Sequence, residues 1–361
     1  MLTAEGCRGR RQRLLDRLIP SHPLLLGDPL NLRYLANFYV DPFSLGADYS
    51  GLLLIQPDGR TTLYHDNRMP KSVEAAHADE RVPVRWYDGK SPGDGPRRLI
   101  LRDVVELSGT EGRIHDLLSD PLAPDLLRAV AEMRRAKDPD EVEALRACMR
   151  AAEAGHDWAR RKVQPGLTEL HVYSGVFHRC SRTVGRPVVV YGDFAVSPGP
   201  ARRGGPPTER EIVAGETLIL DYSVVIQGYR SDFTNTLVVG ADPTPEQQRL
   251  FDLCVAAMAE GEKLLRAGAA CKDVYDAVRG SFDREGMADY FPHHAGHGLG
   301  LGHPEAPFFV KDATETLIAG DVVTLEPGLY IEGIGGVRIE HNYLITQDGY
   351  ERLSNHTIAL K

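Results

Sequence analysis

The sequence predicts a two-domain α+β protein, and three observations support that prediction. The 361 residues are enough for two hydrophobic cores, and a composition of 42% hydrophobic and 26% charged residues is ordinary for a globular protein. Runs of β-forming residues around short turns predict strands in both halves. A strong helix start follows Lys137, so we expect one domain at residues 1–137 and a second at 138–361.

The first domain mixes strand-like runs with short helices. Residues 52–55 read Leu-Leu-Leu-Ile, which is typical of a buried strand, and a turn at residues 56–60 follows them. Residues 61–64 form the expected returning strand. We therefore predict a small α/β domain here.

Two similar helix starts divide the second domain. Asp138 and Glu141 are spaced as a capping box, with proline at the first helical position, and Thr244 and Gln247 repeat this arrangement. Apolar residues follow both at helical spacing. The similarity indicates an internal duplication, and a duplicated domain usually places its site between the halves.

Bulk properties limit the partners and the compartment. The net charge of −9 argues against a nucleic-acid partner, which needs a basic face. No run approaches the roughly 20 apolar residues of a membrane span. The five cysteines are odd in number and lack C-x-x-C spacing, which is typical of reduced thiols in the cytoplasm.

Four acidic residues occur in two predicted hairpins. Around the turn at residues 227–228, Asp221 is expected opposite Thr234, with Asp232 as its diagonal neighbour on the same face. Glu326 and Glu340 are equidistant from a second turn at residue 333. Burial of such carboxylates without a partner is costly, so divalent cations are the favoured solution.

A glycine-rich segment at residues 291–307 adds four histidines: His293, His294, His297 and His303. Carboxylates with one imidazole suit Mn²⁺, Co²⁺ or Zn²⁺, and hard oxygen ligands favour Mn²⁺. Four carboxylates can bridge two ions ~3.5–4 Å apart, as in two-metal hydrolases. The residues therefore predict a dinuclear metal site.

The order D-x10-D, G-H-G-x-G, L-E-P-G and G-V-R-I-E resembles the M24 family of metallopeptidases, most closely its Xaa-Pro dipeptidases (prolidases) and aminopeptidases P. The chain from residue 138 resembles the family's duplicated "pita-bread" domain. The segment before it, which includes Asn-Leu-Arg-Tyr-Leu at residues 31–35, resembles the family's creatinase-type N-terminal domain. The resemblance implies one ion bound by Asp221, Asp232 and Glu340, and a second bound by Asp232, His297, Glu326 and Glu340.

The resemblance also implies a function. A hydroxide activated by two metal ions would cleave Xaa-Pro bonds in dipeptides or short peptides. Glu326 would pass the proton of the nucleophile to the leaving nitrogen, and His293 or His303 would stabilise the tetrahedral intermediate. Arg338 and Tyr330 occupy positions of substrate-binding or supporting residues in the family.

Two departures from the family pattern bear on the substrate. Pro304 stands where a catalytic histidine normally precedes Glu305, and His303, one place earlier, serves only if the backbone shifts its aim. Gly204 stands where the family has a loop histidine. Arg202 or Arg203, in the same loop, would supply the positively charged hydrogen-bond donor that the histidine normally provides, and would also suit a substrate carboxylate. The alternative is that both arginines belong to a solvated basic loop.

Two other functions remain open at this stage: a creatinase-like hydrolase or lyase of altered specificity, and a non-catalytic binding module. Retention of all five metal ligands favours an enzyme. The family resemblance implies a homodimer, and the sequence does not distinguish a dipeptidase from an aminopeptidase.

Overall fold

The computed structural model describes residues 1–40, 51–85, 87–92, 113–196 and 204–361. It divides into two compact units, Met1–Arg134 and Arg135–Lys361. Among the described helices, none combines the length and the apolar character that a membrane crossing requires.

The first unit contains a four-stranded sheet in the order β1-β2-β3-β4, in which β3 and β4 are parallel and the other pairs antiparallel. The predicted strand, turn and returning strand near residue 55 are confirmed as β2 and β3. Its elements are α1 (Ala4–Leu18), β1 (Leu24–Leu26), α2 (Pro29–Ala36), β2 (Gly51–Ile55), β3 (Thr61–Asp66), α3 (Pro70–Glu74), β4 (Glu80–Val84) and α5 (Ala123–Met133).

The second unit begins with two helices and an antiparallel sheet. In this sheet β6 lies at the centre, pairing with β5 on one side and with β7 and β8 on the other. The elements are α6 (Pro139–Lys162), α7 (Glu169–Val184), β5 (Val189–Asp193), β6 (Thr217–Ile226), β7 (Tyr229–Arg230) and β8 (Phe233–Val238).

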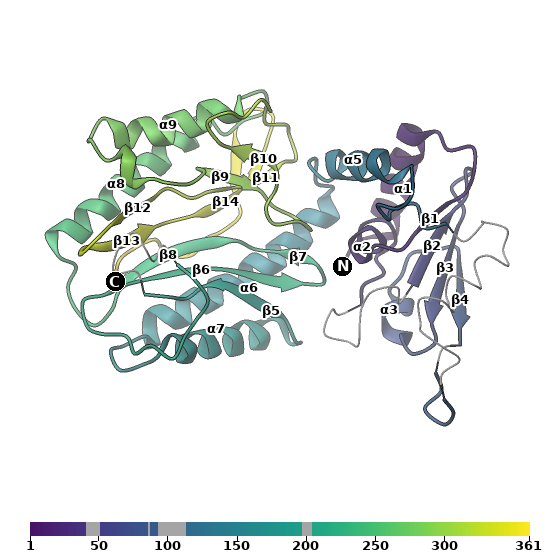
Figure 1. The fold of residues 1–361 in the computed structure, drawn as a ribbon, viewed down its shortest axis with the longest axis horizontal. Coiled ribbons are helices and arrows are strands. Elements are labelled where there is room, and N and C mark those ends of the chain that lie inside the picture. Colours follow the sequence, from purple (N-terminus) through teal and green to yellow (C-terminus); the bar gives the residue numbers. More distant parts are fainter. Residues whose placement is uncertain (41–50, 86, 93–112, 197–203) are drawn as a thin grey trace. The chain divides into compact units, whose positions relative to one another are not determined.

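Another helix pair and further strands complete this unit. The five-stranded sheet has the order β10-β9-β11-β14-β15, while β12 and β13 form a separate pair. The elements are α8 (Pro245–Glu262), α9 (Cys271–Asp283), η1 (Ala288–Tyr290), β9 (Gly296–Gly298), β10 (Glu305–Phe309), β11 (Val322–Leu325), β12 (Gly328–Ile331), β13 (Gly335–Arg338), β14 (His341–Ile345) and β15 (Tyr350–Arg352). In Figure 1, α6 and α7 lie along one side of the strands and α8 and α9 along the other.

Local sequence signals explain the helix starts and the strand register. Both predicted capping boxes form: the Asp138 backbone donates to Glu141 at 3.0 Å, and the Thr244 backbone donates to Gln247 at 2.9 Å. Gln227 and Gly228 both have positive φ, as the tight turn between β6 and β7 requires.

The predicted register of both acidic hairpins is confirmed. Asp221 pairs with Thr234. In the second hairpin Gly328 pairs with Arg338, so that Glu326 and Glu340 stand opposite each other just beyond the ladder.

Candidate metal centre

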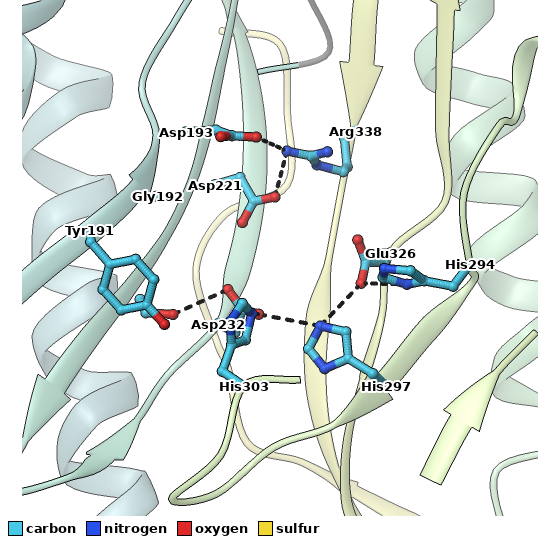
Figure 2. Close-up of a pocket in the computed structure, with 11 residues that line it drawn as sticks. Tyr191, Gly192, Asp193, Asp221, Asp232, His294, His297, His303, Glu326 and Arg338 are labelled. Atoms are coloured by element: carbon cyan, nitrogen blue, oxygen red, sulfur yellow. Dashed lines mark hydrogen bonds and ion pairs between the residues drawn. The ribbon is translucent and has the colours of Figure 1, made fainter. Parts of the chain in front are cut away.

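One small cavity of ≈ 190 Å³ in the second unit brings together residues from four strands, β5, β6, β9 and β13, and from the loops beside them. Figure 2 shows acidic side chains and imidazoles pointing toward one another in this cavity. The cavity is lined by Tyr191, Gly192, Asp193, Asp221, Ser223, Asp232, His294, His297, His303, Glu326 and Arg338.

Adjacent positions on one sheet face deliver the first two carboxylates. Asp193 on β5 pairs with Asp221 on β6, which pairs with Thr234 on β8. Residues paired across antiparallel strands point to the same face, so these side chains form one row. Asp232 follows β7, and its Oδ1 lies 3.4 Å from the hydroxyl of Ser223 in the neighbouring row.

The second hairpin delivers the other two carboxylates to the same place. Glu340 is almost wholly buried; its backbone N–H donates to the carbonyl of Thr234 at 3.0 Å. The Thr234 hydroxyl donates to Glu340 Oε2 at 2.7 Å. Glu326 Oε1 lies 3.3 Å from the Thr324 hydroxyl. Threonine contacts thus aim both glutamates into the site.

Three histidines surround the carboxylates. His297 Nε2 is 3.6 Å from both Asp232 Oδ2 and Glu326 Oε1, which places it between them. His303 Nε2 lies 2.6 Å from Asp232 Oδ2, so the backbone does turn this side chain into the cavity despite Pro304. His294 Nδ1 is 3.3 Å from Glu326 Oε1.

The electrostatics of the site reflect an excess of buried negative charge. Burial raises the pKa of Asp221 to about 7, although the guanidinium of Arg338 opposes that shift. Burial, then the charges of Asp232 and Glu326, raises the pKa of Glu340 well above its usual range. Burial also raises the pKa of Glu326, but the neighbouring histidines outweigh it and lower this pKa below its ordinary value.

Contact with these carboxylates raises the pKa of two histidines. Burial lowers the pKa of His303, but its contact with Asp232 outweighs burial and raises the pKa. The same balance, with Glu326 as the partner, raises the pKa of His294. Since a carboxylate only accepts hydrogen bonds, His303 Nε2 carries the proton in its contact with Asp232.

Arg338 connects the two hairpins. Its Nη2 lies 2.5 Å from Asp221 Oδ2 and 2.8 Å from Asp193 Oδ2. Its Nη1 donates to the Tyr330 hydroxyl at 3.2 Å, and that hydroxyl lies 2.9 Å from His293 Nε2. Tyr330 and His293 are therefore tied to the centre through Arg338, and burial lowers the pKa of His293 to about 4.

The donor set fits divalent cations. Ligand atoms of Asp221, Asp232 and Glu340 lie within 4.8 Å of one another, as do those of Asp232, His297 and His303. Asp232 belongs to both groups. Glu340 Oε1 is buried and has no hydrogen-bond partner among the residues that the structure describes. A buried carboxylate oxygen without a partner is costly unless a cation compensates it.

Sequence reasoning missed several residues that shape this site. Tyr191, Asp193 and Ser223 line the cavity but belong to no recognisable motif. Asn342 accepts from the backbone N–H of Asp232 at 3.2 Å and donates to its carbonyl. Alternation along the strands could have indicated Ser223, whereas the others depend on long-range contacts. The predicted Arg202 and Arg203 lie outside the described residues.

Comparison with known proteins agrees with this geometry. The model of metallopeptidase family M24 matches residues 143–347. An uncharacterised peptidase of Staphylococcus aureus (strain USA300) is 28% identical over 341 residues, 91% of this chain and 93% of that protein.

Two solved structures share the fold. An Xaa-Pro dipeptidase from Bacillus anthracis is 24% identical and superposes with a TM-score of 0.78, covering 98% of this chain and 99% of the other. An X-Pro aminopeptidase from Thermotoga maritima is 20% identical, with a TM-score of 0.77 and coverage of 100% and 99%.

Fold and site together define a metal-dependent peptidase. The chain belongs to metallopeptidase family M24. The expected α+β architecture with a pita-bread metallopeptidase domain is confirmed.

Proposed function

We propose that this peptidase binds two divalent cations and cleaves Xaa-Pro bonds in dipeptides or short peptides. The observation that carries the proposal is the convergence of four carboxylates at and beside one small cavity that His297 also lines. Asp221, Asp232 and Glu340 supply ligand atoms within 4.8 Å of one another, and Asp232 is shared with a second group that contains His297. A shared carboxylate suits a residue that bridges two ions.

When bound, the cations lower the pKa of a water molecule and polarise the scissile carbonyl. Glu326 accepts the proton of the attacking water and returns it to the leaving nitrogen, a role that its ionised carboxylate beside His294 and His297 supports. His303 holds a proton on Nε2 inside the cavity and stabilises negative charge that develops on the substrate oxygen.

The remaining predicted residues position these groups. Arg338 orients Asp221 by its short ion pair and holds the Tyr330 hydroxyl. His293 Nδ1 donates to the carbonyl of His294, so His293 Nε2 accepts from that same hydroxyl at 2.9 Å. Through Tyr330 and Arg338, the His293 side chain acts on the centre and on the bound peptide.

Proline at the second substrate position is supported by the activities of two structural neighbours, an Xaa-Pro dipeptidase and an X-Pro aminopeptidase. Oxygen-rich ligation favours Mn²⁺ over Co²⁺ or Zn²⁺. We extend the proposal to a homodimer in the cytoplasm; the five buried free cysteines suit a reducing compartment.

The test is peptide hydrolysis by the Mn²⁺-loaded protein, with metal content measured on the same sample. We expect about two ions per chain and cleavage of Xaa-Pro dipeptides or tripeptides in preference to matched Xaa-Ala peptides. Chelation should abolish activity and Mn²⁺ should restore it. An Mn²⁺-loaded protein that leaves every Xaa-Pro peptide intact refutes the substrate, and activity on other C–N bonds would favour a creatinase-like specificity. One ion per chain refutes the dinuclear centre.

A further inference from the structure

The sheet that carries Asp221 and Asp232 places one arginine directly beside the metal centre. β7 and β8 both pair with β6 in a continuous register: Thr234 opposes Asp221, and Arg230 opposes Val225. Side chains two residues apart along a strand share a face. Arg230 therefore lies on the face that carries Asp232, one row farther along the sheet.

Tyr191 holds Arg230 in this position. It lies on β5 opposite Ser223, in the same row as Asp232, and it lines the cavity. Arg230 Nη1 donates to the Tyr191 hydroxyl, and the guanidinium carbon lies 5.6 Å from the centroid of the tyrosine ring. The ring of Tyr191 also meets His303 edge to face, with centroids 6.1 Å apart. The contacts form a continuous wall from Arg230 to the site.

The charge of Arg230 is not neutralised in the described part of the chain. No carboxylate there lies within 4.0 Å of its guanidinium, and its buried Nε has no hydrogen-bond partner among the described residues. Arg338, the arginine inside the cavity, is the opposite case, because Asp221 and Asp193 both bind it. Nη1 of Arg230 donates to Tyr191, so Nη2 is the donor group that Arg230 offers to an external anion.

We propose that Arg230 is a specificity-determining residue that binds the C-terminal carboxylate of a short peptide substrate. This inference rests on the proposed function. The carboxylate of a dipeptide lies one residue, ~3.5 Å, beyond the scissile carbonyl. One row of the sheet, about 6.6–6.8 Å, separates Arg230 from Asp232. The substrate carboxylate extends about half of that distance from the scissile carbonyl, and the arginine side chain is long enough to span the rest. Its planar guanidinium matches the two oxygens of a carboxylate.

The experiment compares two substrates of the Mn²⁺-loaded enzyme: an Xaa-Pro dipeptide and the same dipeptide with a C-terminal amide. The measured quantity is the ratio of kcat/KM for the acid to kcat/KM for the amide. Arg230→Ala should lower this ratio about 10- to 100-fold, chiefly through a higher KM for the acid. Arg230→Lys should restore part of the ratio, and Tyr191→Phe should lower it less than Arg230→Ala does.

Arg249→Ala is the matched control, because Arg249 lies on the exposed surface of α8 and should leave the ratio at the wild-type value. Arg230→Gln gives a second neutral variant if Arg230→Ala fails to fold, as monitored by thermal melting. An unchanged ratio in a folded neutral variant overturns the role of Arg230 while the proposed function stands. A wild-type enzyme that cuts neither substrate overturns the proposed function itself.

Discussion

The carboxylate of Asp193 occupies the space into which a side chain at position 204 would extend. A Cβ atom built on Gly204 would lie 1.9 Å from Asp193 Oδ2, and the backbone there has φ +149°, which disfavours any other residue. Asp193 is itself held by Arg338 at 2.8 Å. The absence of a histidine at this position therefore has a steric reason.

The first prediction concerns this contact. Gly204→Ala should lower the free energy of unfolding by about 1–3 kcal/mol, because the new methyl group displaces Asp193 and strains the backbone. In an Asp193→Ala background the same substitution should cost less. Denaturant unfolding of the two single variants and the double variant measures this coupling, and strict additivity would contradict it.

A second prediction concerns pH and metal. The pKa of Glu340 is raised in the folded protein, so its contribution to stability is present at low pH and is lost as pH rises through the folded pKa. After chelation, Glu340→Gln should therefore be more stable than the wild type at pH 8, with a smaller gap at pH 5. Added Mn²⁺ should reverse the order at pH 8 by stabilising the wild type more. Thermal melts at both pH values, with and without metal, test both parts.

The third prediction separates His303 from histidines in general. His303→Ala should lower kcat/KM on the order of 10²-fold, because a proton donor to the developing oxyanion is lost. His178→Ala, on the exposed surface of α7, is the matched control and should keep wild-type activity. Both variants should melt near the wild-type temperature, and equal activity of the two would argue against His303.

Asn342 supports a fourth prediction. Its side chain holds the backbone of Asp232 on both sides, so Asn342→Ala should weaken metal affinity about 10- to 100-fold. Asn235→Ala is a suitable comparison, because Asn235 is also buried but binds the backbone of Ala359 instead. Titration with Mn²⁺ should show the loss of affinity for Asn342→Ala alone.

The fifth prediction concerns three buried histidines behind the site. His156 donates to the carbonyl of Phe233 and His356 to that of Thr234, while His341 packs against His356. Burial lowers the pKa of His356 to about 4. A histidine whose pKa is lowered by folding stabilises the folded state at pH values above its unfolded pKa of about 6.5. This contribution is lost as the pH falls towards 4. The stability advantage of the wild type over His356→Asn should therefore shrink by ~2 kcal/mol between pH 7.5 and 4.5, as urea unfolding would measure.

Local signals predicted a large part of the catalytic unit. The turns at Gln227-Gly228 and Gly333 set the register of two hairpins, and strand alternation then aligned Asp221 with Thr234 and Glu326 with Glu340. The capping boxes at Asp138 and Thr244 marked helix starts correctly. These features depend on neighbours within a few residues, which is why a single sequence reveals them.

Contacts between distant segments were beyond such reasoning. Arg338 was expected near the site, but its ion pairs with Asp193 and Asp221 join residues more than a hundred positions apart. The orientation of the His303 side chain into the cavity depends on the path of the backbone, which residue types alone do not specify.

The sequence by itself determined which chemical groups were available and how the strands carrying them alternate, because hairpin register and helix capping are local properties. Only the tertiary structure decided which of those groups share one cavity and which charges are already neutralised. Arg338 and Arg230 show the difference: both are arginines on strands around the site, yet packing gives the first two carboxylate partners and gives the second only the Tyr191 hydroxyl among the described residues. Burial and distance, which set electrostatic energies, exist only in the folded chain.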